Sequence, residues 1–139
     1  ITEMVGKEGF LSWKEIEEMS ASGIITIGSH TKTQCWLPDQ GDSDLKEELS
    51  GSKDILEKRL KKAVGLISYP IGAHDERVKI AASLAGYKAA VATNPGKEKP
   101  RDDVFAIKRQ RISNSSDSLF VFWVESSGFY TFIKEHRDD

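Results

Sequence analysis

Short apolar runs alternate with longer amphipathic segments along this chain, and this alternation constrains its fold more than any other feature. Runs rich in β-branched and small apolar residues occupy positions 24–27, 66–69 and 87–93, and a fourth strand is predicted around 105–112. Apolar residues in the intervening segments recur every three or four positions, as expected of helices with one buried face. Strands that alternate with helices pair in parallel, in an open sheet or a barrel. The sequence therefore predicts an α/β fold.

Capping signals mark where the predicted helices begin and end. Ser12 and Glu15 have the spacing of a capping box, and Gly23 lies where a helix over 11–23 would end. Asp75 is placed to cap another helix, which Gly86 ends. Between these two, a helix is predicted through a charged stretch by leucines at helical spacing, namely Leu45, Leu49, Leu56 and Leu60.

A last, aromatic-rich helix is predicted to open at Ser116 or Asp117. Its aromatic residues are predicted to be core, unless an unclosed barrel exposes them: Phe120, Phe122, Trp123 and Phe129.

Length, charge and cysteine content exclude several classes of protein. The 139 residues suffice for one domain, 1–139, with a hydrophobic core. A net charge of −2 provides no attraction to nucleic acid. No apolar run approaches the roughly 20 residues needed to span a bilayer. The single cysteine, Cys35, excludes an internal disulfide and a Cys-rich zinc motif, and we interpret it as chemically inert.

In parallel α/β folds the chemistry gathers where strands end and the following loops begin. Segment 27–31 places His30 directly after the first predicted strand, which is a rigid mount for a metal ligand. Segment 68–72 is placed to aim a backbone N–H at a bound group. Each segment also has a structural interpretation, because a lone histidine often serves as a hydrogen-bonded structural residue and a Pro-Gly pair often ends a strand.

The order of several motifs resembles that of the polysaccharide deacetylases, the NodB-homology domains of carbohydrate esterase family 4. The segments that carry the resemblance follow one another over roughly Leu11 to Ser116: Phe10–Trp13 with Ile27–Thr31, then Ser68–Glu76, then Ala85–Val91 with Thr93–Gly96, and finally Arg109–Ser113. The resemblance implies a distorted (β/α) barrel that removes acetyl groups, mainly N-acetyl, from a polysaccharide or oligosaccharide. It also implies a divalent, zinc-like metal held by one Asp and two His, and a location outside the cytoplasm or at the cell envelope.

Residue by residue, the resemblance assigns part of a catalytic apparatus. His30 matches the first histidine ligand of the metal, and Thr31 matches the Ser or Thr beside it, in contact with substrate. Gln34 stands at the second ligand position, where an amide oxygen is a poorer zinc ligand than imidazole. Pro70 and the backbone N–H of Ile71 match the loop that holds the oxyanion.

Further side chains are candidates for substrate contact. Tyr69 and His74 flank the loop proline, and Trp36 follows the histidine loop. His74 has the alternative of simply preceding a helix cap, and Trp36 that of anchoring its own loop. Arg109 and Arg111 share one face of a predicted strand, in an ion pair, as support for the site, or facing solvent. His136 is interpreted as part of a solvated tail.

The sequence departs from the family where the family has an Asp-Asp pair after its first strand. The chain contains Asp-Asp only at 102–103 and 138–139, neither after a buried strand near the N-terminus. Together with the initial Ile1, this predicts a truncated domain that lacks the first two strands, is inactive by itself and self-associates through exposed edges. The alternatives are a non-catalytic relative that binds glycan or a protein partner, which Gln34 favours, and a generic α/β fragment without a function of its own.

Overall fold

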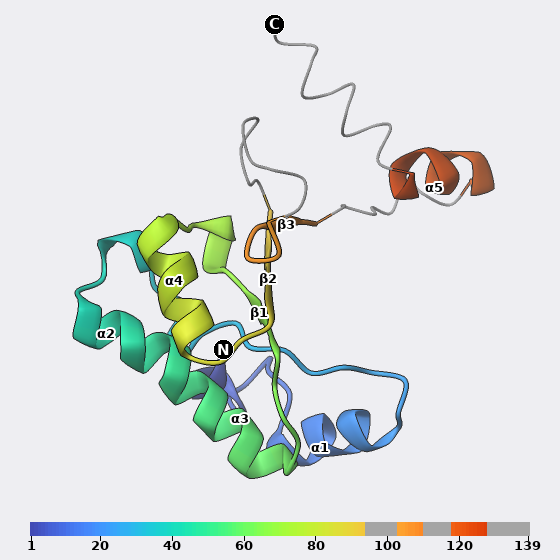
Figure 1. Cartoon of the computed structure of the whole chain (residues 1–139). Coiled ribbons are helices and arrows are strands. Elements are labelled where there is room, and N and C mark those ends of the chain that lie inside the picture. Colours follow the sequence, from blue (N-terminus) through green and yellow to red (C-terminus); the bar gives the residue numbers. More distant parts are fainter. Residues whose placement is uncertain (94–102, 110–117, 128–139) are drawn as a thin grey trace, which may run out of the picture.

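Three parallel strands form the sheet of this protein, whose computed structural model describes residues 1–93, 103–109 and 118–127 (Figure 1). The strands are β1 (Leu66–Ser68), β2 (Ala89–Ala92) and β3 (Ile107–Lys108), in the order β1-β2-β3. Ser68 pairs with Val91, and Val91 with Ile107, so the carboxyl ends of all three strands lie at one edge. The predicted α/β fold with parallel strands is confirmed. Residues 110–112 of the last predicted strand lie outside the described residues.

Five helices accompany the sheet in the described part of the chain: α1 (Trp13–Ala21), α2 (Asp42–Lys46), α3 (Ser52–Leu60), α4 (Glu76–Leu84) and α5 (Leu119–Ser126). A π-helical turn, η3 (Glu47–Gly51), joins α2 to α3, so the leucine-spaced segment is one nearly continuous helical run. Single 3-10 turns lie at η1 (Thr2–Met4), η2 (Leu37–Asp39) and η4 (Pro70–Gly72). In Figure 1, α2, α3 and α4 lie together on one side of β1 and β2.

The capping predictions are confirmed at both ends of the helices concerned. Ser12 and Glu15 form the reciprocal capping box of α1, and Gly23 follows the helix with a φ of +74°. The side chain of Asp75 accepts a hydrogen bond from Val78 N (2.8 Å) at the start of α4. These signals are local in sequence, so they identify the helix boundaries without knowledge of tertiary contacts.

The core lies between the sheet and the helical run α2–η3–α3 with α4. Its buried side chains come from these helices, from β1 and β2 and from the residue after β1, and they include Leu45, Leu49, Leu56, Ile67, Tyr69, Val78, Ala82, Ala90 and Ala92. Alternate residues of β1 and β2 face this core, whereas Leu66 on the opposite face is 45% exposed. The strands are thus buried on one face by helices, as a period of two requires.

The prediction of a buried strand over 24–27 is wrong. Ser29 alone forms an isolated parallel bridge, with Ile67, and the residues before it are not in a strand. Ile24 is 89% exposed and Ile25 41% exposed. A parallel strand is buried only where neighbours cover it, and among the described residues segment 24–27 has no strand on its outer side. The segment has the apolar composition of a buried strand, but its Ile24 and Ile25 side chains are exposed in this structure.

Helix α5 differs from the other helices in having no buried residue. It begins after Ser118, and the predicted openings at Ser116 and Asp117 lie outside the described residues. Phe120 is 71% exposed, Phe122 46% and Trp123 63%, so the prediction that these three are core is wrong and the alternative of exposed aromatics holds. Phe129 lies outside the described residues. Figure 1 shows α5 away from α1–α4. No helix in the described ranges is long and apolar enough to cross a membrane.

Candidate functional site

The carboxyl edge of the sheet brings together two of the loops singled out by the sequence. Ser29 N donates to Leu66 O (2.8 Å), and Ser68 N donates to Ser29 O (2.9 Å), which places the histidine loop beside the end of β1. On the other side of β1, Tyr69 N donates to Val91 O (3.1 Å) at the end of β2. The loops after position 29 and after β1 therefore start from adjacent backbone.

His30 is held in one tautomer by a backbone carbonyl. Its Nδ1 lies 2.7 Å from Ser68 O, and because a carbonyl only accepts, Nδ1 carries the proton. The other ring nitrogen, Nε2, has no partner among the described residues. Burial lowers the pKa of His30 by more than the hydrogen bond to Ser68 O raises it, and the positive charge of Arg109 lowers this pKa further. A neutral imidazole with a free Nε2 is the form that binds metals and accepts protons.

The loop after His30 has an unusual backbone conformation. Thr31 and Gln34 both adopt positive φ angles, +62° and +68°, which residues with side chains rarely do. Thr31 is fully buried, and its hydroxyl accepts a hydrogen bond from Gln34 N (3.2 Å). Gln34 itself is exposed. The structure therefore gives Thr31 a place inside the loop, while Gln34 is open to solvent.

Sequence reasoning missed Glu48, which contacts this loop from η3. Its carboxylate accepts hydrogen bonds from Lys32 N (2.9 Å), Thr33 N (3.0 Å) and Thr33 Oγ1 (2.7 Å). Burial alone would raise the pKa of Glu48, but these hydrogen bonds outweigh burial and the pKa is lowered. A single glutamate within a leucine-spaced charged helix carries no signal of this role in the sequence.

The loop after β1 presents a backbone N–H. Pro70 is buried, whereas Ile71 is 71% exposed and has a φ of +57°. No described residue accepts a hydrogen bond from Ile71 N. The Ile71 carbonyl is held by Thr93 Oγ1, which donates to it at 2.9 Å, so the peptide that follows Ile71 is fixed from the end of β2. An unpaired, exposed N–H in a fixed turn is suited to bind an anion.

The three candidates for substrate contact lie in different surroundings. Tyr69 is 1% exposed, its hydroxyl has no partner among the described residues, and burial together with the charge of Asp103 raises its pKa. The ring of His74 stacks on Tyr69 with centroids 5.0 Å apart, and His74 Nδ1 donates to Gly72 O (2.8 Å). Trp36 is 48% exposed and precedes η2, and its carbonyl accepts a hydrogen bond from Gln40 Nε2 (3.0 Å).

Other candidates named by the sequence are placed as follows. Arg109 N donates to Ala92 O (3.0 Å), and its charge reaches His30, whereas Arg111 and His136 lie outside the described residues. Cys35 packs partly buried against the core, and burial raises the pKa of its thiol, as suits an unreactive cysteine.

The donor set at this edge fits one ligand of a zinc-type metal but not a complete centre. His30 offers the Nδ1–H···O=C arrangement typical of metal-bound histidines. Within the described ranges, however, no group of three or more His, Cys, Asp or Glu side chains lies close enough to hold a metal ion. Gln34 contributes an amide rather than an imidazole or carboxylate.

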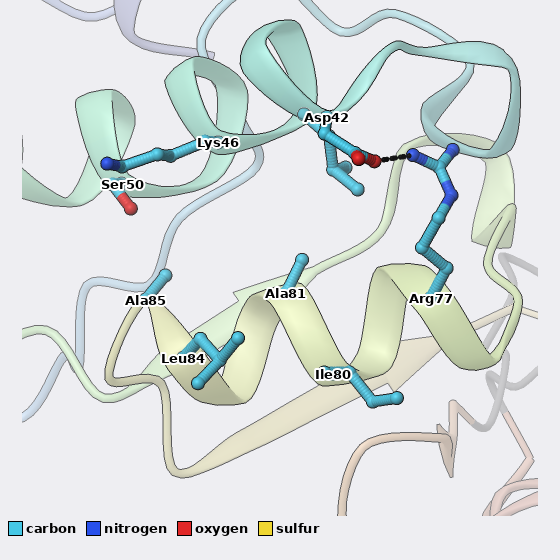
Figure 2. Close-up of a pocket in the computed structure, with 9 residues that line it drawn as sticks. Asp42, Lys46, Ser50, Arg77, Ile80, Ala81, Leu84 and Ala85 are labelled. Carbon is cyan, nitrogen blue, oxygen red and sulfur yellow. Dashed lines mark hydrogen bonds and ion pairs between the residues drawn. The ribbon is translucent and has the colours of Figure 1, made fainter.

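A separate hollow of about 500 Å³ lies between the α2–η3 segment and α4 (Figure 2). Its floor is largely apolar, with Leu45, Ile80, Ala81, Leu84 and Ala85 among its lining residues. At one end, Arg77 forms an ion pair with Asp42 (2.8 Å), drawn as a dashed line in Figure 2. None of the candidate site residues lines this hollow.

Comparison with known proteins gives the same family for most of the chain. The family model described as polysaccharide deacetylase matches residues 1–90. The protein YxkH of Bacillus subtilis (strain 168), a polysaccharide deacetylase by its name, is 30% identical over 127 residues, which cover 91% of this chain and 45% of that protein.

Solved structures agree with the sequence relatives. The polysaccharide deacetylase BC0361 from Bacillus cereus matches with a TM-score of 0.77 and 37% identity over 89% of this chain and 39% of its own. The Streptococcus pyogenes deacetylase PplD, solved in complex with acetate, matches with a TM-score of 0.73 and 28% identity over 81% of this chain and 50% of its own. The chain thus spans half or less of the length of these relatives.

Proposed function

This chain belongs to the polysaccharide deacetylase family, and on that premise we propose that its site serves the metal-dependent hydrolysis of N-acetyl groups on a glycan. Its fold is a partial, distorted (β/α) barrel of the kind found in the solved deacetylases. By analogy with the family, the substrate is an N-acetylated polysaccharide or oligosaccharide outside the cytoplasm or at the cell envelope. The proposal concerns the site these residues build, because the chain covers only part of its relatives.

The observation that carries the proposal is the pairing of two free groups on adjacent loops. His30 directs its proton at Ser68 O and leaves Nε2 as an acceptor, and Ile71 offers a backbone N–H that no described residue accepts. One group suits a metal or a proton, and the other suits the oxygen of an acetyl group that becomes negative during hydrolysis. Both are positioned from β1, one through the hydrogen bond to Ser68 and the other through Pro70.

A divalent metal in this family would polarise the acetyl carbonyl and activate water. In this chain His30 would be its ligand, Gln34 would stand at a degenerate second position, and Thr31 would support the loop between them. The Ile71 N–H would hold the oxyanion, with buried Pro70 fixing the turn. Tyr69 and His74 would shape the floor beside it through their ring stack, and Trp36 would offer an exposed face to a sugar ring.

We further propose that these 139 residues are inactive by themselves. The family's Asp pair after a first strand has no counterpart in the sequence, and loss of a general base alone costs about 10²–10⁴ in rate. The second candidate is a non-catalytic relative that binds glycan or a protein partner through the same loops. Gln34 favours this candidate, because it weakens the metal site independently of any missing Asp pair.

One titration separates the two candidates. The purified protein is titrated with Zn²⁺ and with an N-acetylated chitooligosaccharide while amide and imidazole NMR signals are recorded. The deacetylase proposal predicts zinc shifts at His30 and oligosaccharide shifts at Ile71, and no acetate release. The binding-only candidate predicts oligosaccharide shifts that zinc does not alter. Metal-dependent acetate release would overturn the proposed inactivity, and no shift at either residue would contradict both candidates.

A further inference from the structure

Among the described residues, Glu48 is the one acidic side chain that accepts hydrogen bonds from the backbone of the histidine loop, residues 30–34. Glu48 is 7% exposed and accepts three hydrogen bonds of 2.7–3.0 Å, from Lys32 N, Thr33 N and Thr33 Oγ1. We propose that Glu48 is a positioning residue, which holds the loop between His30 and Gln34 in the conformation that its ligand role requires. The ligand role of the loop rests on the proposed function, whereas the support of the loop by Glu48 rests on the contacts alone.

The loop needs such support because its own backbone does not favour this conformation. Thr31 and Gln34 have φ values of +62° and +68°, so two non-glycine residues in four adopt a sparsely populated conformation. Conformations of this kind persist only where the surroundings determine them. The Glu48 carboxylate binds the two residues between these positions, Lys32 and Thr33, through both of their backbone N–H groups.

The irregular helix that carries Glu48 is anchored from its other side. In the π-helical turn η3, the Leu49 carbonyl accepts from Ser52 Oγ (3.0 Å) and from Tyr87 OH (2.9 Å), besides the backbone N–H of Ser52. Ser52 Oγ also lies 2.9 Å from Ser29 Oγ, and Thr31 N donates to that same Ser29 oxygen (3.1 Å). The loop is therefore bound to the η3–α3 helical run at two places: Ser29 contacts Ser52 at the start of α3, and Lys32 and Thr33 contact Glu48 in η3.

Charge supports the assignment to Glu48 rather than to its neighbour. The net effect of burial and hydrogen bonds lowers the pKa of Glu48, so the side chain is an anion that accepts strong, charge-assisted hydrogen bonds. Glu47, one residue earlier, is 62% exposed in its side chain, and within the described part of the chain it bonds only the Lys32 ammonium (2.8 Å). Glu47 thus provides a matched control, because it has the same charge and lies in the same helical turn but contacts the Lys32 side chain rather than the loop backbone.

The test compares Glu48→Gln and Glu48→Ala with Glu47→Gln in the full chain. Hydrogen exchange is measured by NMR at the Lys32 and Thr33 amides and, as a global reference, at the buried Ala82 amide. We expect exchange at Lys32 and Thr33 to accelerate about tenfold in Glu48→Gln and more in Glu48→Ala, with Ala82 changed less. Glu47→Gln should leave all three amides within about twofold.

The second readout is Zn²⁺ affinity, measured where each variant is fully folded. Under that condition, substitution of a purely structural residue would leave the Zn²⁺ affinity unchanged. We expect Glu48→Gln to weaken zinc binding about tenfold, as loss of a supporting hydrogen bond does elsewhere, and Glu47→Gln to leave it unchanged. If Glu48→Ala fails to fold, Thr33→Val, which removes one of the three donors, takes its place with a smaller acceleration confined to the loop.

The outcomes separate this inference from the proposed function. Uniform acceleration at all amides, or equal effects of the Glu47 and Glu48 variants, would overturn the positioning role. A wild-type protein that binds no zinc would count against the proposed function, while the exchange pattern would still decide whether Glu48 holds the loop. Local acceleration together with weaker zinc binding supports both.

Discussion

Replacing Gly72 with alanine should destabilise the protein through the turn that presents the Ile71 N–H. Gly72 has a φ of +80°, which costs an L-residue about 1–2 kcal/mol. An added Cβ would also overlap the Thr93 hydroxyl and lie 2.9 Å from Thr93 N, a backbone atom that cannot move aside cheaply. Overpacking of this kind costs about 1–3 kcal/mol.

The same overlap would displace the hydroxyl that holds the turn. Thr93 Oγ1 donates to the Ile71 carbonyl at 2.9 Å, and loss of this partly exposed hydrogen bond adds about 0.5–1 kcal/mol. The total expected loss in the free energy of unfolding is about 2.5–6 kcal/mol. That is a large share of the stability of a domain this size, roughly 5–15 kcal/mol.

Gly86→Ala provides the matched control. Gly86 has nearly the same φ, +83°, but its Cβ would meet only the flexible end of Lys53, at 3.6 Å. We expect a loss of about 1–2 kcal/mol for Gly86→Ala. Urea unfolding followed by circular dichroism measures both variants. Equal losses, within about 0.5 kcal/mol, would refute the argument that Thr93 closes the space beside Gly72.

The remaining predictions concern the caps and the buried carboxylate. Ser12→Ala should lower stability by about 1 kcal/mol because it removes half of the α1 capping box, and Ser12→Thr, which keeps a capping hydroxyl, provides the comparison in the same unfolding assay. Asp75→Ala should cost a similar amount by releasing Val78 N, whereas Asp75→Asn should keep most of the cap; equal losses would argue against capping. The folded pKa of Glu48 lies below its ordinary value of 4.5, so its stabilising effect is present above pH 4.5 and is lost as pH falls through the folded pKa. Glu48→Gln should therefore flatten the decrease in stability below pH 4.5, and an unchanged acid slope would contradict this.

What the sequence predicts well is local. The capping box at Ser12, the cap at Asp75 and the leucine spacing from Leu45 to Leu60 depend on residues a few positions apart, and the structure confirms all three. The motif order along the chain is also sequential information, and it identified the family that the comparisons show.

What the sequence misses depends on distant contacts. The run 24–27 has the composition of a buried strand, but burial depends on neighbours that the described residues do not provide. Trp123 has the size and apolar character of a core residue, yet it is 63% exposed because no described neighbour covers it. Glu48 accepts a hydrogen bond from Lys32, 16 residues earlier in the chain. No spacing rule identifies which of the many acidic residues binds this loop.

The most direct test of the central claim, that His30 and position 34 belong to one deacetylase-type metal site, is the zinc affinity of Gln34→His. Restoring an imidazole four residues after His30 should strengthen Zn²⁺ binding, measured by isothermal titration calorimetry, by more than about tenfold. The gain should disappear when His30→Ala is added and persist when His74→Ala is added instead. An affinity that Gln34→His leaves unchanged, or a gain that survives the loss of His30, would contradict the account.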